Sequence, residues 1–311
     1  MNNPIYTFAL ANFKNKYMKK IILGALVLLN FYTVSAQQNE KDNLKKNEEA
    51  IAKSSEEKPN GWTKKGLFTF LANQATFNNW TAGGQSNVSG NIGVNYDFNY
   101  KNSNWNWDNK LIIGYGLTKI KDQDLQKSDD RLQFNSLIGK KASGYWFYSG
   151  FVNFKTQFDS GFEGGVKTSH FFSPAYLQFG PGMLWKKSDN LKVNIAPATS
   201  KVILVHSHFT EFGPSFGVEQ GKTTRFEFGA ALSGYYKFQL AENITCENIL
   251  NLYSNYLEDP QNVDLDYTLN ISMKINKYLS TNFAYQTIYD DNAFRGFQTR
   301  QVIGLGLNYG F

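Results

Sequence analysis

The residues of this chain best suited to chemistry are charged side chains that alternate with apolar ones along several stretches. Successive side chains of an extended strand point to opposite faces, so these charges would share one face and meet in a common interior. We expect the basic residues of that interior to be Lys110, Arg131, Lys155, Arg225, Lys237, Lys274 and Arg300. We expect the acidic ones to be Asp97, Asp108, Glu227, Glu247, Asp264 and Asp266.

The near balance of the two signs bears on what such an interior could do. An ion-selective pore lines its constriction with charges of one sign. A balanced set favours an interior that is partly filled by ion pairs. Two functions therefore stay open: a narrow channel for small solutes, and a structural or partner-binding protein with an ion-paired, filled lumen.

A lipid hydrolase is a weaker alternative, suggested by His206-Ser207-His208. A serine nucleophile needs a base within hydrogen-bond reach and a third group that orients the base. Neighbours on a strand point to opposite faces, so Ser207 and His206 would not pair if the strand continued that far. The remaining histidine, His170, belongs to a different predicted loop. We therefore predict that the protein is not an enzyme.

Metal binding is similarly weak in the sequence. A site built from the three histidines has no supporting spacing. The pairs Asp129-Asp130 and Asp290-Asp291 fall on predicted outer loops and could bind Ca²⁺ through carboxylate oxygens. Solvated acidic loop tips are the commoner case, so we predict neither a metal nor a cofactor.

The element that would position these charges is clearest at 296–311. Every second residue from Phe297 to Phe311 is apolar, aromatic or uncharged, and the residues between are small or polar apart from Val302. This pattern is typical of a transmembrane β-barrel strand, with lipid on one side and a polar lumen on the other. The alternative, an edge strand of a soluble sheet, would leave an aggregation-prone edge. Tyr309 and Phe311 resemble the carboxyl-terminal signal that the outer-membrane barrel assembly machinery recognises.

The same alternation predicts an all-β fold, a single antiparallel up-and-down barrel of about twelve strands. Prolines 174, 181 and 197 weaken the sixth and seventh strands, and losing both would leave ten. The inner turns, 101–104, 142–144, 187–190, 239–242 and 277–278, are short. The outer loops, 78–85, 120–130, 159–173, 206–223, 258–262 and 290–296, are longer, which is the usual asymmetry of bacterial barrels. The strands are predicted at 66–77, 86–100, 105–119, 131–141, 145–158, 174–186, 191–205, 224–238, 243–257, 263–276, 279–289 and 296–311.

The tenth predicted strand gives the sharpest assignment of faces. Odd-numbered residues from Val263 to Ile275 are apolar or aromatic, and the residues between them are mostly polar. We expect Leu269 to face lipid and Asn270 to face the lumen. A slip of one residue would exchange the two faces.

The amino-terminal residues predict export. Residues 1–36 form a signal peptide, of which 18–36 carries the basic start, the short apolar core and the small residues before a cut after Ala36. Residues 37–61 are a charged periplasmic tail, and 62–311 form the barrel. We expect the outer membrane of a Gram-negative bacterium, with its lipid as a partner and the transported solute unknown.

Composition agrees with this class of protein. The chain of 311 residues has 26 Phe and 18 Tyr. This number of aromatic residues suits strands in which every second side chain faces lipid. The net charge of +6 is spread along the chain without a dense basic run, so we expect no nucleic-acid partner. Cys246 is the single cysteine and cannot form an internal disulfide.

Several short motifs resemble one known family. These are Phe77-Asn78-Asn79-Trp80-Thr81-Ala82-Gly83-Gly84, Trp107-Asp108-Asn109, Lys127-Ser128-Asp129-Asp130, Phe172-Ser173-Pro174-Ala175-Tyr176-Leu177, Asn262-Val263-Asp264, Met273-Lys274-Ile275-Asn276-Lys277-Tyr278-Leu279-Ser280 and Ile288-Tyr289-Asp290-Asp291. Over about Trp62 to Phe311 the chain resembles a Bacteroidetes outer-membrane β-barrel family known as a domain of unknown function, DUF3078. The resemblance implies fold and compartment, and it implies no activity.

Overall fold

Twelve antiparallel strands close into a single barrel in the computed structural model of the chain, as the alternation predicts. The structure describes residues 60–76, 86–163, 165–292 and 294–310. The predicted signal peptide, nearly all of the charged tail and Phe311 therefore lie outside the described residues. The barrel strands are β1 (Gly61–Ala75), β2 (Asn87–Lys101), β3 (Trp105–Ile120), β4 (Leu125–Ser143), β5 (Trp146–Thr156), β8 (Ala175–Ser188), β9 (Leu191–Leu204), β10 (Thr224–Ala241), β11 (Ile244–Asn255), β12 (Val263–Lys274), β13 (Leu279–Asp290) and β14 (Phe294–Gly310).

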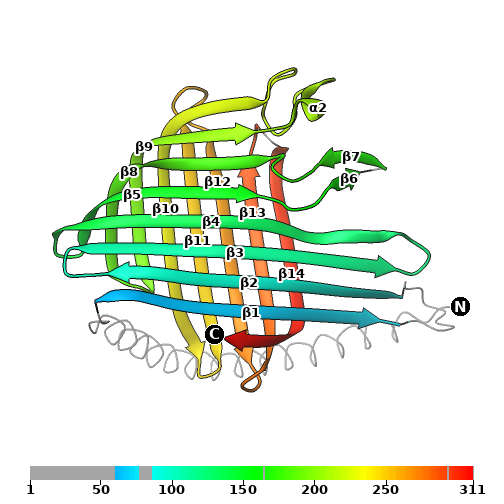
Figure 1. Cartoon of the computed structure of the whole chain (residues 1–311), viewed down its shortest axis with the longest axis horizontal. Coiled ribbons are helices and arrows are strands. Elements are labelled where there is room, and N and C mark those ends of the chain that lie inside the picture. Colours follow the sequence, from blue (N-terminus) through cyan, green and yellow to red (C-terminus); the bar gives the residue numbers. More distant parts are fainter. Residues whose placement is uncertain (1–59, 77–85, 164, 293, 311) are drawn as a thin grey trace, which may run out of the picture. The chain divides into compact units, whose positions relative to one another are not determined.

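Each barrel strand pairs with the barrel strands before and after it in the chain, and β14 pairs with β1 to close the ring. The closing ladder is the shortest, running from Leu67 opposite Gly310 to Ala72 opposite Leu305. Strands β1 to β5, β8 and β9 form one wall, and β10 to β14 cross behind them at a steep angle (Figure 1). Strong tilting of strands is what closing a sheet into a barrel requires.

Two strands begin at least five residues earlier than the sequence predicts. β1 starts at Gly61, before the predicted 66, and β4 starts at Leu125, before the predicted 131. Asp129 and Asp130 therefore lie in β4, so their placement on an outer loop is wrong. The polar run that suggested a loop is instead the part of the β3–β4 hairpin near its tip.

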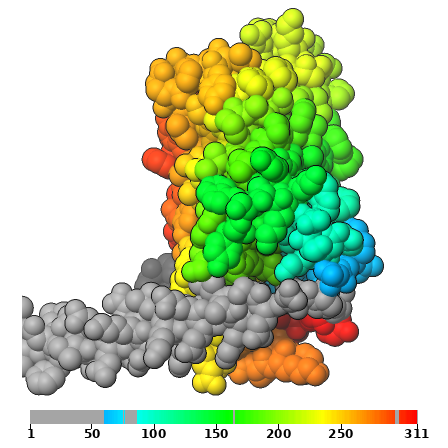
Figure 2. Space-filling model, turned by 90° about the vertical axis from the view of Figure 1, so that its left-hand side faces the viewer, coloured from blue at the N-terminus to red at the C-terminus, as the bar shows by residue number. Residues whose placement is uncertain are grey.

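The prediction that every outer loop exceeds every inner turn is also wrong. The connection 121–124 is no longer than 275–278, because β3 and β4 continue as a hairpin almost to its tip. The connections 157–174, 205–223 and 256–262 remain long, and all lie at one end of the barrel. Figure 2 shows the turns near residues 242 and 276 at the bottom and the loop 205–223 at the top.

Two of the long connections carry structure of their own. The hairpin of β6 (Gly161–Glu163) and β7 (Val166–Ser169) lies within the predicted loop 159–173. The one-turn helix α2 (Ser207–Thr210) lies within the predicted loop 206–223. Among the described residues, no helix is both long and apolar enough to cross a membrane.

The proline-containing strands are present, and a bulge accommodates them. Pairing between β8 and β9 is interrupted from Phe179 to Met183, where β9 carries one extra residue. A side chain at Gly182 would meet the Ile195 carbonyl oxygen at 2.5 Å, so glycine is required for this close approach. The bulge also changes which side chains of β9 point inward.

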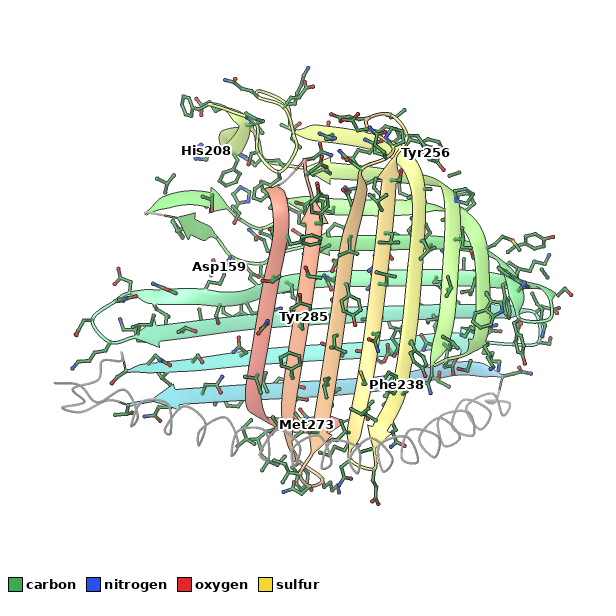
Figure 3. All side chains as sticks on the ribbon, turned by 180° about the vertical axis from the view of Figure 1, so that it is seen from behind. Asp159, His208, Phe238, Tyr256, Met273 and Tyr285 are labelled. Atoms are coloured by element: carbon green, nitrogen blue, oxygen red, sulfur yellow. The ribbon has the colours of Figure 1, made fainter. Side chains whose placement is uncertain are left out.

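The outer face of the barrel carries many exposed apolar side chains. Figure 3 shows Phe238, Met273 and Tyr285 on the outer face of the rear wall. On β14 the residues Ile303 and Leu307 are more than half exposed. An outer surface of this kind belongs in lipid rather than in water.

Candidate functional site

Lys110 and Glu247 meet inside the barrel. Lys110 lies on β3 and Glu247 on β11, and Nζ lies 3.4 Å from Oε1. These strands are not neighbours in the barrel order, so the contact crosses the interior. Glu247 also accepts hydrogen bonds from the Tyr235 hydroxyl at 2.8 Å and the Asn270 amide at 3.0 Å. Both carboxylate oxygens are thus satisfied, as a buried charge requires.

Asp108 makes a second connection, near the end with the short turns. Its carboxylate on β3 lies 2.9 Å from the ammonium of Lys186 on β8 and 2.7 Å from that of Lys192 on β9. The Lys186 side chain is only 7% exposed and also lies 3.1 Å from Asp189. One carboxylate therefore ties together three strands, of which only β8 and β9 are neighbours in the barrel.

Two further contacts link opposite walls. Lys155 on β5 lies 3.5 Å from Asp266 on β12, which also accepts a hydrogen bond from Gln286. Arg300 on β14 lies 2.7 Å from Asp129 on β4. Neither pair of strands is adjacent in the barrel, so both contacts cross the interior. Arg131 lies 3.8 Å from the same Asp129 carboxylate.

Lys201 is the most highly connected charge, near the end with the long loops. Its ammonium lies 3.0 Å from Asp264, 3.2 Å from Glu227 and 3.6 Å from Asp290. The Glu227 side chain is 2% exposed and also pairs with Arg225 at 2.8 Å. Lys201 comes from β9, whereas Asp264 and Asp290 come from β12 and β13. The cluster therefore joins both walls of the barrel.

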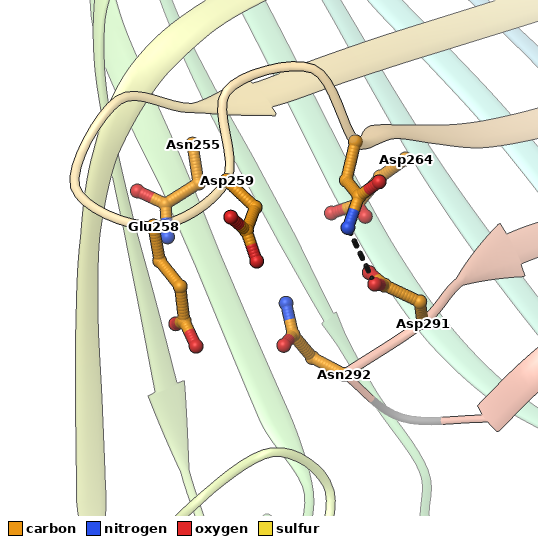
Figure 4. A pocket seen from close by; sticks show the side chains of 7 residues that line it. Asn255, Glu258, Asp259, Asp264, Asp291 and Asn292 are labelled. Atoms are coloured by element: carbon orange, nitrogen blue, oxygen red, sulfur yellow. Dashed lines mark hydrogen bonds between the residues drawn. The ribbon is translucent and has the colours of Figure 1, made fainter.

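Above this cluster lies an acidic pocket. Asn255, Glu258, Asp259, Asn262, Asp264, Asp291 and Asn292 line it (Figure 4). The carboxylates of Asp264, Asp290 and Asp291 each place an oxygen within 4.8 Å of the others, and oxygen is the ligand that Ca²⁺ prefers. The Lys201 ammonium contacts both Asp264 and Asp290, and the Asn262 amide donates to Asp291 at 2.7 Å. Each of the three carboxylates therefore already has a partner within the protein.

The other predicted calcium pair is engaged differently. Asp130 accepts from Lys127 at 2.7 Å and from the backbone amides of Phe158 and Asp159. These contacts hold the start of the β5–β8 connection against β4. Close by, the Tyr115 hydroxyl donates to Asp159 at 2.9 Å, and this hydrogen bond lowers the pKa of that loop carboxyl.

Apolar side chains fill the interior toward both ends. Phe147 and Leu184 are almost completely buried near the short turns. At the opposite end Ile203, Val205 and Val218 form a buried cluster. Val218 belongs to the 205–223 connection, so this loop folds back onto the barrel mouth. Tyr176, Phe209 and Phe216 pack against the cluster.

The structure brings all nine principal predicted charges into ion pairs. These are Lys110, Arg131, Lys155, Arg225, Glu227, Glu247, Asp264, Asp266 and Arg300. Asp97 and Asp108 are paired as well. For Lys237 and Lys274, no ion pair occurs within the described part of the chain.

Several partners were not predicted from the sequence, among them Asp129, Lys186, Lys192, Lys201 and Asp290. Asp129 and Asp290 fell on predicted loops. Strict alternation puts Lys192 and Lys201 on opposite faces of β9. The bulge opposite Gly229 and Ala231 inserts one residue between them, so both point inward. The available signal in the sequence was Pro197 in β9, which lies between the glycine-containing strands β8 and β10. A proline here indicates a bulge, but it does not show which side chains the bulge turns inward.

The residues of the hydrolase alternative lie on the 205–223 connection. His206 caps α2 and its Nδ1 accepts a hydrogen bond from the His208 backbone amide at 3.2 Å. The rings of His170 and His206 lie 5.2 Å apart, edge to face. Among the hydrogen bonds of the described residues, none joins the Ser207 hydroxyl to a histidine. The geometry therefore shows packing of a loop and no nucleophile–base pair.

Comparison with solved structures gives distant likenesses of fold. The translocator domain of the autotransporter NalP from Neisseria meningitidis is 10% identical, with a TM-score of 0.35, covering 89% of this chain and 98% of that one. An outer membrane channel from Pseudomonas putida F1 is 9% identical, with a TM-score of 0.37, covering 82% and 96%. OmpT, an outer membrane protein of Vibrio cholerae, is 11% identical, with a TM-score of 0.29, covering 82% and 99%.

Comparison by sequence adds one finding. No curated protein matches the chain. The family model described as Protein of unknown function (DUF3078) matches residues 72–162. The motifs after residue 162 and the Bacteroidetes origin lie beyond this match and stay predictions. The predicted resemblance to the DUF3078 family is confirmed over residues 72–162.

Proposed function

We propose that this chain is an outer-membrane barrel of a Gram-negative bacterium whose lumen is closed at rest by ion pairs. Its role would be non-enzymatic: the barrel anchors the long loops at the cell surface and the charged segment 37–61 in the periplasm. The observation that carries the proposal is the set of ion pairs between strands that are not neighbours in the barrel, above all those of Lys110, Arg300 and Lys201, which join opposite walls.

The outer surface supports insertion into a membrane. Phe226, Ile303 and Tyr309 are each about three-fifths exposed and lie on the lipid-facing side of their strands. Exposing such side chains to water over a whole barrel would leave an apolar patch far larger than soluble monomers carry. A lipid bilayer makes the same surface favourable.

The interior supports closure. Twelve strands lie between the small barrels that side chains fill and the large barrels that leave a channel. Here long charged side chains span the interior and neutralise one another, so one sign does not dominate as it does in a selective pore. The apolar groups Phe147 and Leu184 at one end and the Ile203 cluster at the other add further obstruction.

A narrow channel for small solutes is the second candidate, because a polar pocket lies in the middle of the barrel. Asn153, Gln178, Asn194, Ser233 and Asn251 line it together with Phe151 and Leu252. A solute could use this region after the ion pairs on either side of it had opened. This candidate therefore requires a conformational change, whereas the closed barrel does not.

Expression with the native amino terminus tests the proposal. The folded protein should fractionate with the outer membrane and migrate faster on a gel when it is not heated. Liposomes that contain it should not swell faster in small sugars than liposomes without protein. Recovery from the soluble periplasm would reject membrane insertion. Rapid swelling would instead reject the closed lumen and support the channel.

A further inference from the structure

Tryptophan side chains collect on the outer face at the end with the short turns. Trp62, Trp105, Trp107, Trp146 and Trp185 all lie near that end of their strands. Trp62 contacts the rings of Phe98, Tyr100 and Trp107, and Trp146 pairs with Trp185 across β5 and β8. Tryptophan is typical of the boundary between lipid chains and headgroups. On the proposed function, this row of side chains, which lies on one wall of the barrel, marks the periplasmic leaflet.

Lysines lie directly beside these aromatic rings. Lys140 places its ammonium 5.8 Å from the centre of the Trp105 ring, and Lys277 places its ammonium 5.4 Å from that of Tyr278. Lys64 follows Trp62 by two residues on the same face of β1. All three lysines are exposed. A lysine in this position lays its stem along the apolar surface and holds its charge at headgroup level.

These three ammonium groups have no ion-pair partner among the residues that the structure describes. Inside the barrel at the same end, Lys186 and Lys192 are both paired. At the opposite end, Lys127 pairs with Asp130, and Lys119 donates to the Gln123 carbonyl. The charges of Lys64, Lys140 and Lys277 are therefore not used within the described part of the chain and are available to a partner.

The surrounding charge has the same sign. Lys101, Lys141, Lys187 and Lys274 also lie at the short-turn end, where Glu242 is the one exposed acid among the described residues. The long-loop end instead exposes mainly acids: Asp122, Asp124, Asp159, Glu211, Glu219, Glu258 and Asp259. An anionic partner is therefore favoured at one end of the barrel and disfavoured at the other.

We propose that Lys64, Lys140 and Lys277 bind the phosphate groups of anionic phospholipids in the periplasmic leaflet. This inference rests on the proposed membrane barrel and names the lipid that its short-turn end selects. Lipid is the occupant because the ammonium groups are continuous with an aromatic, lipid-facing surface. The result is a preferred lipid shell on one leaflet, which would help to fix the depth of the barrel.

The tryptophans themselves provide the assay, because five of the six lie at this end and the sixth, Trp80, lies outside the described residues. The full chain would be folded into phosphatidylcholine vesicles containing a small fraction of brominated phosphatidylglycerol or brominated phosphatidylcholine. The ratio of quenching by the two lipids reports their relative association. One lysine near an anionic surface corresponds to roughly fivefold enrichment, so a ratio well above one is expected at low salt.

Two triple variants complete the test. K64Q/K140Q/K277Q should bring the ratio close to one, and high salt should do the same to the wild type. K121Q/K167Q/K222Q removes the same charge from the long loops and should leave the ratio unchanged. A wild-type ratio of one, or equal loss in both variants, would overturn the inference. Absence of quenching by either lipid, with no fast-migrating unheated band, would instead overturn the membrane barrel.

Discussion

Replacing Lys201 by methionine should destabilise the barrel far more than replacing an exposed lysine at the same end. The ammonium of Lys201 lies within 3.6 Å of three carboxylates, those of Asp264, Glu227 and Asp290. Methionine keeps most of the aliphatic stem and removes the charge. Three acidic groups then share the space with Arg225, which is in contact with Glu227 alone among them.

The magnitude follows from two opposing terms. In an effective dielectric of about 20, an ammonium and a carboxylate at 3 Å attract by about 5 kcal/mol. Desolvating each ion costs several kcal/mol, so the intact cluster gains little over an apolar one. Removing one partner leaves the desolvation cost without the attraction, and for buried pairs this amounts to about 3–5 kcal/mol. The variant Lys201→Met should lose free energy of unfolding in this range.

Reversible unfolding in urea, with the barrel folded into lipid vesicles, measures this loss. Lys222→Met, an exposed lysine at the same end, is the matched control and should change the free energy of unfolding by less than about 0.5 kcal/mol. Adding Asp264→Asn to Lys201→Met should cost less than the sum of the two single changes, because a shared interaction is lost once. Equal effects of Lys201→Met and Lys222→Met, or strict additivity, would refute the ion-pair cluster.

Three further predictions concern register, packing and export. Leu269→Arg should cost about 2–4 kcal/mol of folding free energy and Asn270→Arg far less, and the reverse order in the same urea assay would invert the faces of β12. Gly182→Ala should cost about 1–3 kcal/mol, because the new methyl group meets the Ile195 carbonyl. Gly150→Ala, which meets nothing closer than 3.7 Å, is its control, and equal costs would contradict the close approach. Amino-terminal sequencing of protein from the outer membrane should begin at Gln37, and retention of residues 18–36 would contradict the signal peptide.

The barrel could be predicted from sequence because period-two alternation survives in nearly every strand. Strand β12 is the clearest case: Asn270 donates to the interior Glu247, and Leu269 lies on the opposite face. Strand ends were less predictable. The run from Lys127 to Asp130 is as polar as a loop, and its β-structure depends on pairing with β3, which no local pattern encodes.

The charged interior could be predicted only in part. The inward orientation of residues such as Lys110 and Glu247 could be predicted because polar and apolar side chains alternate without interruption along their strands. Lys192 and Lys201 were not, because the β9 bulge changes parity between them. The sequence also could not predict which charged side chains pair across the interior, since this depends on the distance between the two walls. Val218 packs onto Ile203 and Val205, and the sequence of the loop alone does not predict this contact.

The central claim is that side chains close the lumen, and ionic current through single molecules tests it most directly. The wild-type barrel, folded and inserted into a planar bilayer in concentrated KCl, should give no open-channel steps at moderate voltage. Removing two of the crossing contacts together, with Lys110→Ala and Arg300→Ala, should give at most small and intermittent currents, because the Lys201 cluster remains. Sustained current steps from the wild-type protein would contradict the account.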